Sequence, residues 1–197
     1  MLVTSLVLAG VGGQGALLTS RILAAGLLAM GHEVKVSEIH GMAQRGGSVI
    51  TQVRFGPRVY SPHFGPGEAD GLIAFEAAEA LRHLPYLKPG GFILTDDQEI
   101  PPLSVAAGQA EYPRGVTQEL KRLVKTVRVV PAGRLARETG HPRGQNLVLL
   151  GALVSALELH GPDWPALVAE LAPAPAREQN LKALALGLEL GLKDSES

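Results

Sequence analysis

A glycine-rich turn near the N-terminus is the feature that most constrains the fold. The segment Leu2–Ala9 is apolar and rich in branched side chains, which predicts a strand buried on both faces of a parallel sheet. It runs directly into Gly-Val-Gly-Gly-Gln-Gly at 10–15, and residues 16–30 then place apolar side chains at helical spacing. A second strand is predicted at 33–39. These elements predict a strand–helix–strand unit, a right-handed parallel crossover that begins at the glycine turn.

The remainder of the chain continues the alternation of strands and helices. Further strands are predicted at 48–55 with a continuation at 58–60, and at 71–75, 92–95 and 126–130. Helices are predicted at 76–84, 116–124, 131–139, 145–159, 163–171 with Asp163 as its cap, and 177–190. The pattern predicts one Rossmann-like, three-layer α/β domain over 1–197, with a mostly parallel sheet and a helical C-terminal region at about 131–192.

The glycine turn also supports a binding hypothesis. Gly10, Gly12 and Gly15 have the spacing that dinucleotide-binding folds use between the first strand and its helix, where the helix N-terminus attracts a pyrophosphate. This interpretation needs a carboxylate at the end of the next strand, and Glu38 is the best placed. The structural alternative is that the glycines let the helix at 16–30 pack closely on the sheet.

Composition excludes several classes of function. The chain has 197 residues, with 18 basic and 19 acidic side chains and a net charge of -1, so neither a nucleic-acid surface nor a polybasic membrane anchor is expected. The apolar N-terminus lacks the basic region of a signal peptide and no transmembrane span is predicted, so a cytoplasmic protein is expected. The chain contains no cysteine, which excludes disulfides, thiol catalysis and cysteine-ligated clusters on this chain.

A second motif follows the second predicted strand. It has the form E-x-x-G-x-x-x-R-G-G and is made up of Glu38, Gly41, Arg45, Gly46 and Gly47. A guanidinium followed by two glycines suits bidentate pairing with a phosphate or carboxylate, as in CoA or a substrate, and Arg45 is the one candidate for a catalytic residue. Equally, Arg45 could pair with Glu38 and fix the loop.

Together the two motifs, with Gly13 and Gln14 in the first, resemble the gamma-subunit family of pyruvate/2-oxoacid:ferredoxin oxidoreductases. The stretch at 41–48 is most similar to the indolepyruvate branch, whose corresponding chain is called the beta subunit. Further matches extend over nearly the whole chain and include Leu84-Pro85-Tyr86-Leu87, Pro89-Gly90-Gly91, Tyr112-Pro113, Asn146 and Asn180. A departure is Ala183-Leu184, where many relatives have Ala-Phe.

The resemblance implies an accessory subunit that is inactive alone and binds no cofactor itself. Thiamine diphosphate, Mg²⁺ and iron–sulfur clusters are then expected on a larger partner subunit, with CoA as co-substrate and ferredoxin reached through the complex. Two other functions stay open: an independent NAD(P)-binding oxidoreductase, and a nucleotide- or CoA-binding module without turnover. A homodimer of the isolated chain is a further alternative.

The resemblance and the motifs give one set of candidate binding residues, expected to contact CoA, another phosphate or the partner subunit. The set is Gly10, Gly12, Gly13, Gln14, Gly15, Glu38, Gly41, Arg45, Gly46 and Gly47. Among other polar residues, His40 is expected to be polar surface, and His63 and His141 lack spaced partners for a metal. Asp96-Asp97 is expected to be a solvated cap rather than a Mg²⁺ site, and Asn146 to have a structural role.

Overall fold

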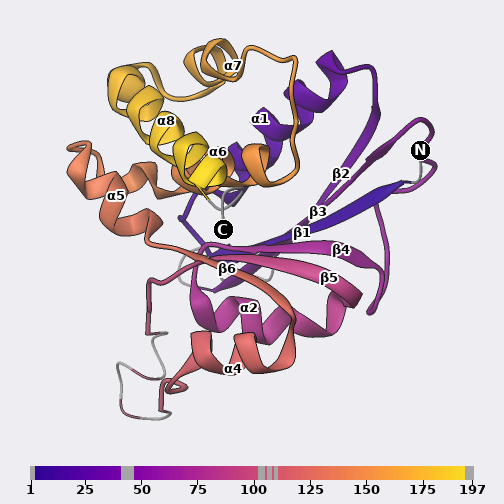
Figure 1. Cartoon of the computed structure of the whole chain (residues 1–197), viewed down its shortest axis with the longest axis vertical. Coiled ribbons are helices and arrows are strands. Elements are labelled where there is room, and N and C mark those ends of the chain that lie inside the picture. The colour runs from indigo at the N-terminus through magenta and orange to yellow at the C-terminus, as the bar shows by residue number, and fades with distance from the viewer. Residues whose placement is uncertain (1–2, 41–46, 102–104, 106–107, 109–110, 194–197) are drawn as a thin grey trace.

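Six strands form one sheet in the order β2-β3-β1-β4-β5-β6, between two layers of helices (Figure 1). The computed structural model describes residues 3–40, 47–101, 105, 108 and 111–193. The strands are β1 Thr4–Val11, β2 Glu33–His40, β3 Ser48–Gly56, β4 Ala69–Ala74, β5 Leu87–Asp96 and β6 Thr126–Val130. The α-helices are α1 Ala16–Ala29, α2 Ala77–His83, α4 Val116–Leu123, α5 Ala132–Glu138, α6 Gln145–Ala156, α7 Trp164–Leu171 and α8 Arg177–Lys193. Short 3₁₀ turns are η1 Leu84–Tyr86, η2 Pro142–Gly144 and η3 Ala174–Ala176.

The predicted three-layer fold with a mostly parallel sheet is confirmed. β1, β4, β5 and β6 pair in parallel, whereas β3 is antiparallel to both of its neighbours, β1 and β2. The unit β1–α1–β2 therefore crosses over β3, and β2 becomes the edge strand instead of the neighbour of β1. The alternation of polar and apolar residues at 48–55 predicts a strand, but it does not indicate which strands lie on either side of it.

The two faces of β1 contact different helical layers. Leu6 and Leu8 pack in the core that contains α1, α6, α7 and α8, while Val7 and Ala9 pack in the core that contains α2 and α4. All four side chains are fully buried. The uniformly apolar sequence of this strand follows from burial on both faces.

Helices α6 and α8 pack at backbone contact within the layer that also contains α1 and α7. A Cβ atom at Gly187 would lie 2.1 Å from the carbonyl oxygen of Val148, and one at Gly151 would lie 2.4 Å from that of Leu184. Both positions therefore require glycine. The residues of α6 from Gln145 to Val154 are all buried, so this helix forms the centre of the helical C-terminal region.

Most element boundaries agree with prediction, and the exceptions have local causes. Asp163 caps α7 as predicted, because its Oδ1 accepts the N–H of Ala166 at 2.9 Å. The predicted continuation of β3 at 58–60 is wrong: Val59 N–H instead donates to Glu33 Oε2 at 2.8 Å. β5 begins at Leu87, earlier than predicted, across an irregularity in its pairing with β4. In the described residues, none of the helices combines the length and apolar character that crossing a bilayer requires.

Candidate functional site

The carboxyl ends of β1 and β4 form the topological switch point of the sheet. β1 leads through α1 to β2 and β3 on one side, and β4 leads through α2 to β5 on the other. In open α/β sheets, ligands bind in the crevice at such a point. The glycine turn at 10–15 follows β1 at this point. The first sequence motif therefore lies where this class of fold usually binds its ligand.

The backbone N–H groups of the turn are largely occupied by the protein itself. Val11 N–H donates to Gln14 Oε1 at 2.6 Å, and Gln14 N–H donates to Val11 O at 3.1 Å. Gly12 N–H donates to the carbonyl of Gly47 at 2.8 Å, which joins the two sequence motifs directly. An anion bound by backbone N–H groups would have to displace these partners.

Side-chain amides fill the crevice between the two strands. Gln14 Nε2 and Gln145 Nε2 both donate to the carbonyl of Phe75, at 2.7 and 2.8 Å. Asn146 Nδ2 lies 3.5 Å from Gly15 O, and a Cβ at Gly15 would lie 2.8 Å from the same nitrogen. The turn is therefore packed against α6, in line with the structural role predicted for Asn146. We call Gln14, Gln145 and Asn146 the amide plug.

The carboxylate required for a dinucleotide lies one strand too far away. Glu38 is opposite Thr51 of β3, and Thr51 is in turn opposite Leu8 of β1. With neighbouring strands about 4.8 Å apart, Glu38 lies about 10 Å from β1 instead of on the adjacent strand. Its side chain is exposed. The geometry thus differs from that of a dinucleotide site, although the glycine spacing matches.

A pocket of about 440 Å³ lies on the α1 side of the turn. Its walls are residues 11–18 with Arg21 of α1, Glu38 and Ile39 at the end of β2, and 49–51 at the start of β3. Ile39 is 44% exposed. The pocket is mainly apolar, with Arg21 and Glu38 supplying charge. It brings together five predicted site residues: Gly12, Gly13, Gln14, Gly15 and Glu38.

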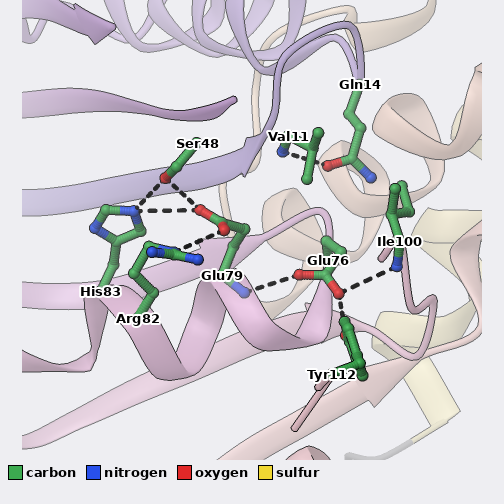
Figure 2. Close-up of polar contacts among 9 residues, drawn as sticks. All are labelled: Val11, Gln14, Ser48, Glu76, Glu79, Arg82, His83, Ile100 and Tyr112. Carbon is green, nitrogen blue, oxygen red and sulfur yellow. Dashed lines mark hydrogen bonds and ion pairs between the residues drawn. The ribbon is translucent and has the colours of Figure 1, made fainter. Parts of the chain in front are cut away.

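A polar cluster lies on the opposite face, behind the start of β3 (Figure 2). Ser48 Oγ donates to Glu79 Oε2 and lies 2.9 Å from His83 Nε2, which is 3.4 Å from the same carboxylate oxygen. Arg82 Nε donates to Glu79 Oε1 at 2.9 Å. Burial raises the pKa of Glu79, but the bonds from His83 and Ser48 and the charge of Arg82 outweigh it, so the pKa is lowered overall.

Glu76, the buried residue that follows β4 and Phe75, anchors three segments (Figure 2). Its Oε2 caps α2 by accepting Glu79 N–H at 2.9 Å. Its Oε1 accepts Ile100 N–H at 3.3 Å and the hydroxyl of Tyr112. Burial and the neighbouring carboxylate raise the pKa of Tyr112, so this phenol stays a donor. Glu76 therefore holds the end of β4, the start of α2 and the chain after β5 together.

The remaining candidate residues from the sequence have different outcomes in the structure. Gly41, Arg45 and Gly46 lie outside the described residues, as do their predicted contacts. The expectation that Asp96 is a solvated cap is wrong: its side chain is fully buried, and Oδ2 accepts Gly133 N–H at 2.9 Å. The described part of the chain contains no group of three or more His, Cys, Asp or Glu side chains able to hold a metal ion.

Sequence reasoning missed Gln145 and the cluster around Glu79. Ser48 is 31 residues from Glu79 and 35 from His83, so no local pattern joins them. The spacing of Glu79 and His83, four residues apart on one helix face, was the available signal. Gln145 precedes Asn146, whose structural role was predicted, and from the start of the same helix it bonds to the carbonyl of Phe75.

Comparisons with known proteins agree with this architecture. The family model described as pyruvate ferredoxin/flavodoxin oxidoreductase matches residues 5–190. The indolepyruvate oxidoreductase subunit IorB of Pyrococcus horikoshii is 39% identical over 192 residues, which are 94% of this chain and 94% of that protein.

Solved structures share the fold at low identity. The gamma subunit of a keto/oxoacid ferredoxin oxidoreductase from Geobacter sulfurreducens superimposes with a TM-score of 0.71 at 23% identity, covering 96% of this chain and 99% of that one. A 2-oxoglutarate:ferredoxin oxidoreductase from Magnetococcus marinus, with 2-oxoglutarate, coenzyme A and succinyl-CoA bound, gives 0.75 at 22% identity over 98% of this chain and 32% of that one. Since the family model and the curated relative both match almost the full length, this chain belongs to the pyruvate ferredoxin/flavodoxin oxidoreductase family.

Proposed function

We propose that this chain is the small subunit of a 2-oxoacid:ferredoxin oxidoreductase that acts on indolepyruvate. The observation that carries the proposal is the near full-length similarity, 39% over 94% of both chains, to a subunit named for indolepyruvate oxidoreductase. In the overall reaction a 2-oxoacid and CoA yield an acyl-CoA, CO₂ and a proton. The two electrons released reduce ferredoxin.

We assign the thiamine diphosphate, Mg²⁺ and iron–sulfur clusters of this reaction to a larger partner subunit. The donor set of this chain does not fit the iron–sulfur clusters, because it has no cysteine. We place the complex in the cytoplasm, and ferredoxin meets it through the larger subunit. This chain alone is then inactive, and within the complex it contributes structure and binding contacts.

We further propose that the pocket beside the glycine turn faces the partner subunit or CoA. The turn itself is internally bonded, so its glycines shape the rim while Glu38 and the segment from Gly41 to Gly47 supply the contacts. Arg45 is the residue of that segment suited to a phosphate or carboxylate. The independent NAD(P)-dependent function is disfavoured because β3 separates Glu38 from β1 and Gly47 occupies Gly12 N–H.

Isolation of the complex tests the proposal. An affinity-tagged chain is expected to recover one larger chain with thiamine diphosphate and iron–sulfur clusters. The complex should reduce ferredoxin or a viologen dye when given indolepyruvate and CoA, and should turn over pyruvate or 2-oxoglutarate more slowly. The isolated chain should show no turnover and no NAD(P) binding by calorimetry. Failure to recover the larger chain, or dinucleotide binding at micromolar affinity, would overturn the assignment.

A further inference from the structure

We propose that Ser48, Glu79 and His83 are positioning residues that fix the β3 wall of the pocket from behind. Ser48 is opposite Val11 and lies on the α2 face of the sheet, whereas the next residue, Val49, turns to the pocket face. The three side chains thus act through the backbone of β3 and not by contact with a ligand. The identity of the ligand at this wall rests on the proposed function. The positioning of β3 by the three side chains does not rest on it.

The geometry separates this cluster from a catalytic triad. In a serine nucleophile system, the carboxylate and the hydroxyl contact different nitrogens of the imidazole. Here both Ser48 Oγ and Glu79 Oε2 contact Nε2 of His83, at 2.9 and 3.4 Å. Because an ionised carboxylate can only accept, the Ser48 hydroxyl must donate its proton to Glu79, and its oxygen accepts from His83. The hydroxyl proton is therefore committed to Glu79 and not to a base.

Stability of α2 does not explain why Glu79 is aimed at Ser48. The N-terminus of this helix is already capped by Glu76, and the side chain of Glu79 is only 6% exposed. A surface orientation would have left Glu79 hydrated, as Glu119 is in its i,i+3 pair with Arg122 on α4. Loss of the Ser48 hydroxyl would leave Glu79 Oε2 with only the longer contact to His83, in a carboxylate that is almost fully buried, so the hydroxyl is a specific attachment point.

Two tethers therefore hold the point where the chain enters β3. From one side Gly12 N–H donates to Gly47 O at 2.8 Å, and from the other side Glu79 and His83 hold Ser48. The tethered residues are consecutive. Release of Ser48 should loosen Gly47 and, with it, the rim of the pocket at Gly12.

Backbone amide exchange in the isolated full chain provides the first test. Ser48→Ala should speed exchange of the Gly12 amide by about ten-fold, the equivalent of one hydrogen bond to a charged group, while the core amide of Leu72 is unchanged. Ser48→Thr keeps the hydroxyl and should restore slow exchange. Unchanged Gly12 exchange in Ser48→Ala would overturn the proposal, whatever the complex does. This outcome is independent of whether the chain has the proposed function.

Steady-state kinetics of the purified complex provide the second test. Ser48→Ala should raise the KM for one of the two substrates, the 2-oxoacid or CoA, by about ten-fold while kcat stays within about two-fold. Ser48→Thr should restore KM. Glu119→Gln, which breaks the matched but exposed pair on α4, should change neither constant. A fall in kcat alone, or equal effects of Ser48→Ala and Glu119→Gln, would contradict a positioning role at the pocket wall.

Discussion

The carboxyl ends of β4 and β5 are neighbours in the sheet, yet their polar groups are partnered differently. After β4, the carbonyl of Phe75 accepts two amide bonds and the carboxylate of Glu76 accepts three bonds. At the end of β5, Asp96 Oδ2 accepts one N–H, and its Oδ1 has no partner among the described residues. The end of β4 is thus fixed by hydrogen bonds, whereas the Asp96 carboxyl group at the end of β5 has a free oxygen that can carry a proton.

The protonation state of Asp96 follows from its surroundings. Burial and the neighbouring carboxyl group of Asp97 raise its pKa to about 7, and the N–H of Gly133 only partly offsets them. The folded chain therefore holds this proton more tightly than the unfolded chain, whose aspartate pKa is near 3.9. Consequently, Asp96 makes the stability of the fold fall as the pH rises from about 4 to about 7.

The largest expected effect is at the fully bonded end. Glu76→Ala removes the cap of α2 and leaves the Ile100 N–H and the Tyr112 hydroxyl without their acceptor, so it should lower the free energy of unfolding by about 4 kcal/mol. Urea denaturation of the isolated chain measures this. Tyr112→Phe removes one donor only and should cost about 1 kcal/mol. Equal losses in the two variants would show that Glu76 does not hold this end of the sheet.

At the other end, substitution should stabilise the protein. Asp96→Asn keeps an acceptor for Gly133 N–H and removes the charge, so it should raise the free energy of unfolding at pH 8 by about 2 kcal/mol. At pH 5, where the folded parent is already protonated, the gain should largely disappear. Denaturant titrations at the two pH values measure the difference. Asp97→Asn is the control. Because Asp97 is exposed and acts on Asp96 only as a neighbouring charge, this variant should also raise the free energy of unfolding at pH 8, but by less. A pH-independent effect of Asp96→Asn would contradict the assignment.

The smallest effect concerns the amide plug. Gln145→Ala should lower the free energy of unfolding by about 1 kcal/mol, because it removes one donor from Phe75 O. Gln14→Ala should lower it by about 1.5 kcal/mol, because it removes the other donor and also leaves Val11 N–H without its acceptor. Either remaining amide still satisfies that carbonyl, whereas the double variant leaves it without both donors. The double variant should therefore lose more than the sum of the single losses, and a double-mutant cycle measures this coupling. Strict additivity would show that the two amides act separately.

The fold was largely predictable because its signals are local. The apolar run of β1, the glycine turn, the helical spacing of α1 and the Asp163 cap each depend on adjacent residues. The insertion of β3 was not predictable, since strand neighbours are set by contacts across the sheet and not by strand composition.

The candidate site was predictable only in part. The glycine turn and Asn146 were found because a glycine pattern and a helix start are visible in sequence. The Ser48 cluster joins β3 to α2, and Gln145 joins α6 to β4, so both depend on tertiary packing. Asp96 was misjudged because two consecutive acids after a strand look alike in sequence, while one is buried and the other exposed.

The insertion of β3 between β1 and β2 also limits what protein engineering could do with this chain. A glycine turn of this kind invites conversion into a dinucleotide-binding enzyme by a few substitutions. Here the acidic residue that would hold the ribose is carried by a strand that no side-chain change can bring next to β1. Gaining such cofactor specificity in this fold would instead require a new carboxylate on β3, the strand that lies next to β1.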